Sequence, residues 1–188
     1  MQGKLASLER VPVETRAAWR AWLRENYRRP DSVWVVTYKK YSGKPYVAYD
    51  ELVEEALCYG WIDSVGGKVD DERTMLLFSP RRKGSVWSKP NKERVARLIA
   101  NGSMRKPGLD KIEAAKADGS WAALDDVDAM ILPDDLAAAL RANPAGQAAW
   151  DARTDSRKKQ ALQWLTSAKR PETRAARIEK LASGATLP

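Results

Sequence analysis

The sequence predicts an α+β protein, with a small antiparallel sheet packed with helices and followed by an all-helical C-terminal part. The run of β-branched and aromatic residues at 33–38 is typical of a buried strand, and the apolar run at 74–78 is predicted to be a second strand. Apolar residues recur at helical spacing on either side of these runs. The chain beyond residue 133 is rich in alanine and poor in β-branched residues. We therefore expect an α+β body over residues 1–124 and a helical region over 134–188 that packs on it.

The N-terminal elements follow from local patterns. A helix is predicted over 13–27, a strand over 33–38 and a short strand over 46–49. Asp50 is expected to cap the next helix, because its side-chain oxygen can accept a backbone N–H in the first turn. Gly60 is placed to end that helix in a left-handed conformation.

Two strands, 61–65 and 74–78, are predicted to form a hairpin. Its turn lies either at Gly66-Gly67 or at the acidic residues 70–72. Two glycines form a common two-residue hairpin loop, whereas the acidic turn leaves longer strands. We favour the acidic turn, with the glycines as a bulge.

The remaining elements are predicted to be helices. Ser88 can cap a helix that ends at Gly102 and turns its apolar residues inward, and a shorter helix covers 109–117. Residues 125–133 are expected to be a linker. Helices then follow over 134–142, 144–152, 155–168 and 171–183, with leucines as their core contacts.

Composition excludes several classes of function. The 188 residues include no histidine and one cysteine, Cys58, so His-based triads, the usual zinc sites and an internal disulfide are excluded. Glycine-rich phosphate motifs are absent. We expect no metal and no cofactor, and Cys58 as an inert buried thiol. The N-terminus lacks a signal-like apolar stretch, and no run of apolar residues is long enough for a transmembrane segment. We therefore expect a cytoplasmic protein.

The excess positive charge is concentrated in one segment. Residues 79–106 contain nine Lys or Arg and one Glu, which equals the formal net charge of +8 of the whole chain. Such a segment attracts anionic partners. The segment carries Trp87 and a predicted helix start, where backbone N–H groups favour an anion. The candidate ligand-binding residues are Trp61, Asp63, Arg81, Arg82, Lys83, Trp87, Ser88, Asn91, Lys92 and Arg94. The alternative is a solvated basic face with Trp87 filling the core.

Three strings carry a family resemblance: EALCYGWIDS, SPRRKGSVWSKPNKERVARLIANGSM and LPDDLAAALRANP, the last followed by SAKRPETRAARIEKL. They resemble the YdeI/OmpD-associated family, also called bacteriocin-protection proteins, over roughly residues 15–185. The resemblance implies a compact α+β body with a helical C-terminal part. It also implies a link to resistance against antimicrobial peptides and envelope stress, and no catalytic residues.

The leading functional hypothesis is a non-enzymatic stress-protection protein that binds an anionic ligand or polymer, including nucleic acid, through the surface from Arg81 to Arg94. An enzyme is the second hypothesis, with Asp63 and nearby cations acting on a phosphorylated or carboxylated small molecule. The third is an adaptor whose basic C-terminal helices bind an acidic protein. A deep pocket ending at Asp63 would favour the enzyme, and a flat basic face would favour polymer binding.

Overall fold

The computed structural model describes residues 5 and 7–185, and these divide into two compact units between Trp121 and Ala122. Each unit has its own hydrophobic core, so each is described by itself. The first residues of the predicted body and the last three of the C-terminal region lie outside the described residues. The predicted packing of 134–188 on the body stays a prediction.

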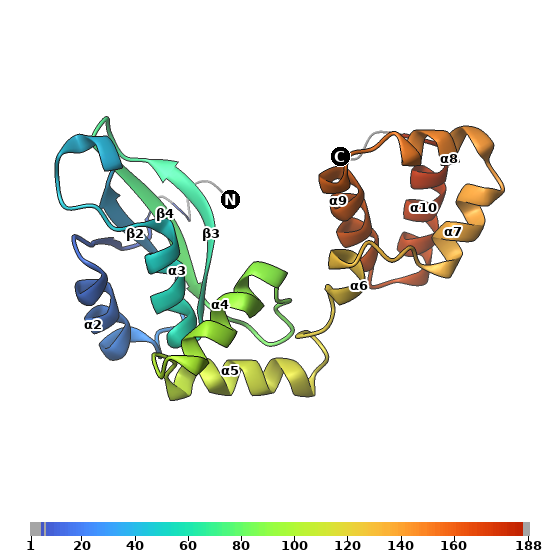
Figure 1. Ribbon diagram of the computed structural model, residues 1–188. Helices are drawn as coiled ribbons and strands as arrows, with labels where there is room; N and C mark the ends of the chain where they lie inside the picture. The colour runs from blue at the N-terminus through green and yellow to red at the C-terminus, as the bar shows by residue number, and fades with distance from the viewer. Residues whose placement is uncertain (1–4, 6, 186–188) are drawn as a thin grey trace. The chain divides into compact units, whose positions relative to one another are not determined.

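The N-terminal unit is an α+β unit, as predicted (Figure 1). Its sheet has the strand order β1-β2-β4-β3, with β2 antiparallel to β4 and β4 antiparallel to β3. The sheet is mixed rather than purely antiparallel, because β1 pairs with β2 in parallel. Sequence patterns missed β1, whose three residues are too few to show alternation. The elements are β1 (Arg10–Pro12), α2 (Arg16–Asn26), β2 (Val33–Tyr38), the 3-10 helix η1 (Lys40–Ser42), α3 (Tyr49–Cys58), β3 (Trp61–Lys68), β4 (Arg73–Pro80), α4 (Lys89–Ala100) and α5 (Lys106–Ala117).

The hairpin between β3 and β4 turns at the acidic residues, as favoured from the sequence. Asp70 Oδ1 accepts hydrogen bonds from the backbone N–H groups of Glu72 (3.0 Å) and Arg73 (2.7 Å), which closes the turn. The pairing register shifts between Asp63 and Gly66, so the irregularity adjoins the glycines. The turn therefore leaves two eight-residue strands.

The predicted strand at 46–49 is wrong. Residues 46–48 are irregular, and α3 begins at Tyr49 with Ala48 in the N-cap position. Glu51 Oε2 accepts a hydrogen bond from the backbone N–H of Ala48 at 2.9 Å, so Glu51 and not Asp50 forms the side-chain bond at this helix start. The helix therefore begins with its N-cap at Ala48, two residues before the predicted cap at Asp50.

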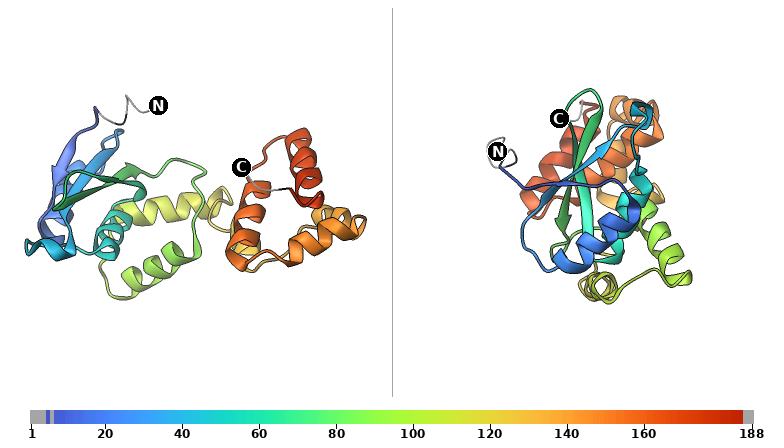
Figure 2. Two further views of the ribbon diagram at one scale, coloured as in Figure 1. Left: turned by 90° about the horizontal axis from the view of Figure 1, so that it is seen from above. Right: turned by 90° about the vertical axis from the view of Figure 1, so that its left-hand side faces the viewer.

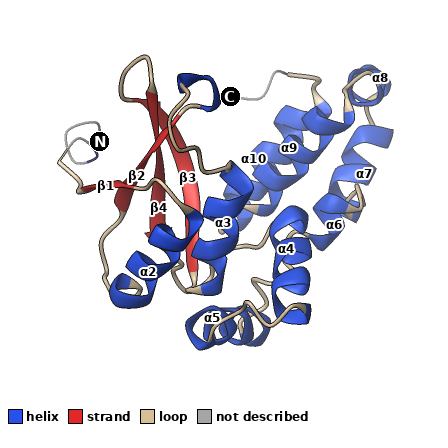
Figure 3. Ribbon diagram, turned by 60° about the vertical axis from the view of Figure 1, so that its left-hand side comes forward, coloured by secondary structure: helices blue, strands red, loops and turns tan. Residues whose placement is uncertain are grey.

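The core of the N-terminal unit lies between the sheet and the helices α2 and α3 (Figure 3). Trp19, Trp61 and Phe78 are fully buried there, and Trp19 packs against Phe78 at a centroid distance of 5.2 Å. Glu55 is also buried and receives hydrogen bonds from Arg16 (2.7 Å) and Arg20 (2.5 Å). Apolar packing and one buried ion cluster therefore hold α2 against α3.

Helix α5 approaches α3 closely at a glycine. A Cβ atom at Gly108 would lie 2.5 Å from the carbonyl oxygen of Leu57, so only glycine fits this contact. Helix α4 precedes α5 and buries Val95 and Leu98, whereas Ile99, which was expected to face inward, is 48% exposed. The Gly108 contact places the end of α5 beside the turn that follows β4.

The C-terminal unit is helical, as predicted, and Figure 2 shows its helices in orange and red. Its core contains Leu136, Leu140, Leu162, Leu165 and Leu181, among others. The four long helices agree with prediction to within two residues. The expected linker contains a short helix whose Val127 joins this core. The elements are α6 (Asp125–Asp128), α7 (Asp134–Arg141), α8 (Pro144–Asp151), α9 (Asp155–Thr166) and α10 (Pro171–Ala182).

Candidate functional site

The candidate site is built around the basic turn, which we define as residues 81–88 between β4 and α4. The backbone N–H of Arg81 donates to the carbonyl oxygen of Gly60 at 2.9 Å, which anchors the turn to the end of α3. Gly84 adopts φ = 75°, a left-handed conformation that suits glycine. The N–H of Ser85 donates to the carbonyl oxygen of Arg82 at 3.2 Å. The turn is therefore a defined structure.

Arg81 and Trp87 lie inside the unit rather than on its surface. Arg81 is 3% exposed and Trp87 is 1% exposed. The guanidinium carbon of Arg81 lies 3.5 Å from the centroid of the Trp87 ring, which is a close cation–π contact. Trp121 packs against Trp87 with ring centroids 5.0 Å apart. Trp87 thus fills the core and supports the arginine.

The Arg81 guanidinium is incompletely satisfied. Its Nη1 donates to the carbonyl oxygen of Val86 at 3.3 Å, while its Nε has no hydrogen-bond partner among the described residues. Burial lowers the pKa of Arg81 to about 10, against the opposing charge of Asp63. The cation stays protonated at neutral pH, since arginine does not release its proton there. Its charge is therefore desolvated without an ion-pair partner in the described chain.

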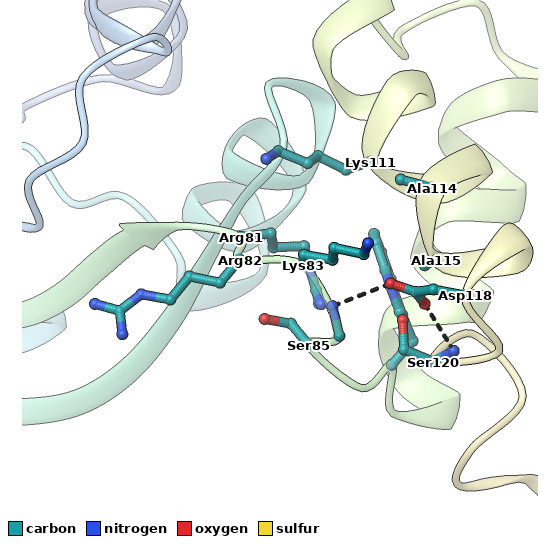
Figure 4. Close-up of a pocket in the computed structure, with 11 residues that line it drawn as sticks. Arg81, Arg82, Lys83, Ser85, Lys111, Ala114, Ala115, Asp118 and Ser120 are labelled. Carbon is teal, nitrogen blue, oxygen red and sulfur yellow. Dashed lines mark hydrogen bonds between the residues drawn. The ribbon is translucent and has the colours of Figure 1, made fainter.

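A cavity of about 180 Å³ lies between the basic turn and α5 (Figure 4). Its lining includes four cationic residues and one acidic residue, Asp118. Figure 4 shows that Lys83 extends toward Asp118, while Arg82 extends away from it. The cavity is lined by Arg81, Arg82, Lys83, Gly84, Ser85, Trp87, Lys111, Ala114, Ala115, Asp118 and Ser120.

Asp118 connects the basic turn to the end of α5. Its Oδ2 accepts a hydrogen bond from the backbone N–H of Gly84 at 3.1 Å, and its Oδ1 accepts one from the N–H of Ser120 at 3.0 Å. Sequence reasoning missed Lys111, Asp118 and Ser120. A carboxylate at the C-terminal end of a helix opposes the helix dipole, and that local conflict at Asp118 was the available signal.

Two predicted site residues lie elsewhere. Trp61 is fully buried in the core, and its Nε1 donates to the carbonyl oxygen of Tyr27 at 3.0 Å. Asp63 does not line the cavity. Its Oδ2 accepts a hydrogen bond from the hydroxyl of Tyr49 at 2.7 Å. Burial, together with this bond, raises the pKa of Tyr49 to about 12. The pair therefore joins α3 to β3 outside the cavity.

The predicted residues on and beside α4 also lie outside the cavity lining. Ser88 takes the N-cap position, but its side chain makes no capping bond. Asn91 is buried, and its Oδ1 accepts a hydrogen bond from Arg94 at 3.0 Å. The ammonium of Lys92 lies 5.4 Å from the centroid of the Trp121 ring. The structure thus brings together Arg81, Arg82, Lys83 and Trp87, and separates them from the rest.

The charges of the basic segment differ between the turn and α4. On α4, Arg94 pairs with Asp50 at 2.5 Å and Arg97 pairs with Glu54 at 3.2 Å. The three cations of the turn, residues 81–83, form no ion pair with any described residue. Two carboxylates of α3 therefore pair with two arginines of α4, while the cations of the turn have no such pairs among the described residues.

Other features of the chain were candidates for chemistry. Cys58 is buried, as predicted, and burial raises the pKa of its thiol to about 11. In the C-terminal unit, Arg174 is held by Asp135 through two hydrogen bonds, and Arg177 donates to Trp164 and to Ser167. Part of the basic C-terminal surface is therefore engaged within its own unit.

Metal ligands and membrane spans were searched over the same described chain. Residues 5 and 7–185 contain no group of three or more His, Cys, Asp or Glu side chains placed to hold a metal ion. None of the helices described is long and apolar enough to cross a bilayer.

Comparison with known families divides the chain in two. Residues 11–111 match a family described as a domain of unknown function, DUF8412. Residues 129–185 match the family described as "Bacteriocin-protection, YdeI or OmpD-Associated". This match confirms the predicted resemblance for residues 129–185, whereas the two strings quoted from the N-terminal half lie outside it, in the region matched by DUF8412. Comparisons with curated proteins and with solved structures gave no match.

Proposed function

The chain belongs to the DUF8412 family through its N-terminal unit, and we propose that this unit binds a small anionic group, such as a phosphate, in the cavity beside the basic turn. The proposed role is binding without catalysis. The observation that carries the proposal is the buried guanidinium of Arg81, which has an unpartnered Nε and no ion-pair partner in the described chain.

The energetics of Arg81 favour an anionic ligand. A buried charge without a direct ion-pair partner costs up to several kcal/mol in proteins, here reduced by the charge of Asp63, and an unsatisfied buried donor costs about 1–3 kcal/mol. The contact with Trp87 offsets about 2 kcal/mol of this when it is desolvated. An anion beside the guanidinium would form the direct ion pair that Asp63 does not form and would supply an acceptor for Nε. Ligand binding would therefore relieve a cost present in the free protein.

The size of the cavity limits the ligand. Typical small-molecule sites have volumes of roughly 300–1,000 Å³, whereas this cavity has about 180 Å³. A phosphate or a similar group fits this space, while the rest of a larger ligand would remain outside. Lys83 and Lys111 line the same cavity and add positive charge, so the site favours anions over neutral groups.

The structure gives less support to the two rival uses of this region. Trp87 is 1% exposed, so it cannot stack on an unpaired base as nucleic-acid binding through this residue would require. Asp63 lies outside the cavity lining and is bound by the Tyr49 hydroxyl. A reaction that used Asp63 together with the basic turn would need a different arrangement of these groups.

The C-terminal match supports a physiological proposal. The matched family is described as bacteriocin-protection, and we connect anion binding in the N-terminal unit to protection of this kind, in the cytoplasm. If so, a strain whose own gene carries the Lys83→Gln change should survive bacteriocin treatment as poorly as the deletion strain. Survival equal to that of the wild-type strain would show that protection does not depend on anion binding in the cavity.

Thermal stability with added anions tests the proposed binding directly. A ligand at 100 times its Kd stabilises the folded state by about 2.7 kcal/mol. For a chain of this size, each kcal/mol raises Tm by roughly 2–4 °C. We therefore expect inorganic phosphate to raise the Tm of the N-terminal unit by several degrees relative to chloride at equal ionic strength. Calorimetric titration would then give the Kd.

Variants assign the binding to the cavity. Lys83→Gln removes a cavity cation at the surface and should weaken phosphate binding, and Arg81→Lys should weaken it further because the fork of donors is lost. Lys89→Gln is the matched control, since Lys89 is an exposed cation that does not line the cavity. Equal binding by wild type and Lys83→Gln, or no binding of phosphate, sulfate or phosphomonoesters at low salt, would contradict the proposal. Binding of oligonucleotides but not phosphate would favour the polymer instead.

A further inference from the structure

The backbone donor of the basic turn is already occupied by a carboxylate of the same chain. Gly84 is the left-handed residue of the turn, and its N–H points to Asp118 Oδ2 at 3.1 Å. The second oxygen of Asp118 accepts from the N–H of Ser120 at 3.0 Å. Asp118 is exposed to solvent, and it lines the cavity together with the buried Arg81.

The position of Asp118 is unfavourable for its own helix. It is the C-cap residue of α5, where the helix dipole is negative and a cation is preferred. Lys83 compensates for this, because it extends toward Asp118 (Figure 4), while Arg81 and Lys111 line the same cavity and the Lys111 amino group is directed away from Asp118. The carboxylate thus lies where an anionic ligand would benefit from the same positive potential.

We propose that Asp118 is an internal competitor of the anionic ligand and sets the affinity of the cavity. This inference rests on the proposed anion binding. An entering anion must either displace the carboxylate from the Gly84 N–H or lie beside it and be repelled. Displacement would also release the basic turn from the end of α5. Asp118 therefore limits binding to anions that interact with the cavity cations more strongly than a single carboxylate does.

The inference predicts which ligands are selected. A monocarboxylate gains little by exchanging with Asp118, because one carboxylate replaces another. A phosphate monoester carries more negative charge and three terminal oxygens, so it can engage several cationic side chains together. The ligand class expected for this cavity is consequently a compound with a terminal phosphate, and acetate should compete poorly.

Two substitutions separate the charge of Asp118 from its hydrogen bonds. Asp118→Asn removes the charge and keeps an oxygen that can accept from Gly84. We expect this variant to bind inorganic phosphate about fivefold more tightly than the wild type at low salt, since one repulsive charge within several ångströms is removed. Its affinity for acetate should also rise measurably for the same reason. Asp118→Ala also frees the Gly84 N–H and should bind phosphate at least as tightly as Asp118→Asn.

Asp110→Asn on the same helix is the matched control, because Asp110 pairs with Lys106 and does not line the cavity. The phosphate affinity of this variant should equal that of the wild type. If wild type binds phosphate and Asp118→Asn binds it equally or more weakly, the competitor role is overturned while the proposed function stands. If neither protein binds phosphate, the proposed function itself fails. Binding by Asp118→Asn alone would show that the carboxylate closes the wild-type cavity, and it would overturn phosphate binding as the function of the wild-type protein.

Discussion

Gly146 provides a quantitative test of the packing in the C-terminal unit. It lies in α8, and a Cβ atom added there would be 1.7 Å from the carbonyl oxygen of Ala182 in α10. Real Cβ contacts are essentially never shorter than 3.0 Å. The backbones of α8 and α10 would therefore have to separate by about 1.3 Å to accept Gly146→Ala. Backbone atoms cannot relieve this contact by a change of rotamer.

The expected free-energy change has two opposing parts. Alanine is better than glycine in a helix by about 1 kcal/mol. Overpacking costs about 1–3 kcal/mol or more, and here the separation also loosens Trp150 and Leu181, which are buried in the same core. The two parts give a net loss of about 0–2 kcal/mol, and we expect the upper end, about 2 kcal/mol, because the contact is with backbone atoms. For a unit of this size, each kcal/mol corresponds to roughly 4–8 °C in Tm, so the transition should fall by about 10 °C.

Hydrogen exchange on the full chain resolves this effect by region. Peptides from 134–182 should lose protection in Gly146→Ala, while peptides from β2 and β4 keep theirs. Ala148→Gly, at an exposed position of the same helix, serves as a measure of helix propensity alone and should cost about 1 kcal/mol. A Gly146→Ala protein as stable as the wild type would refute the close contact between α8 and α10.

Two further predictions concern the N-terminal unit. Glu55→Gln leaves Arg16 and Arg20 without their buried counter-charge; because both arginines are partly hydrated, we expect a loss of about 2 kcal/mol rather than the roughly 3–5 kcal/mol of a fully buried pair. Urea unfolding measures this loss. The control Glu25→Gln, at an exposed ion pair, should change the free energy of unfolding by less than about 0.5 kcal/mol. Equal losses in the two variants would show that the Glu55 ion pairs contribute no more than an exposed pair. The thiol of Cys58, with its pKa raised to about 11, should react with iodoacetamide at pH 8 at least about 100-fold more slowly than in the urea-unfolded chain, because few thiolates are present. Rapid labelling of the folded protein, followed by mass spectrometry, would contradict this.

The helices of the C-terminal unit could be predicted closely from the sequence because local signals agree there. Asn143 and Thr154 cap their helices with side-chain oxygens, as shown by their bonds to Gly146 and Arg157. Pro144 and Pro171 stand in the first turns of α8 and α10. Each boundary therefore depends on residues within a few positions of it.

The region 46–49 shows where local reasoning was insufficient. Tyr46, Val47 and Tyr49 have high strand propensity, yet propensity is a weak preference that tertiary contacts override. Val47 is buried in the core, and Tyr49 enters α3 with its hydroxyl on Asp63. These contacts come from segments distant in sequence, and no pattern within the run predicts them.

The candidate site could be predicted only in part for the same reason. The charge map identified the basic turn correctly as the place where positive charge is unbalanced. It could not predict that Arg81 and Trp87 are buried, because both residue types occur on surfaces and in cores. Lys111 and Asp118 come to the cavity through the approach of α5 at Gly108, and this contact depends on the folded arrangement.

The separation of the two hydrophobic cores has an evolutionary consequence. The cores share no residue, and the two family matches, at 11–111 and 129–185, fall on opposite sides of the division after Trp121. A substitution inside one core changes no packing partner in the other, so the two halves can diverge at different rates. Either half can also be joined to another sequence without first redesigning its interior. Such a chain is well suited to joining an α+β half and a helical half by gene fusion.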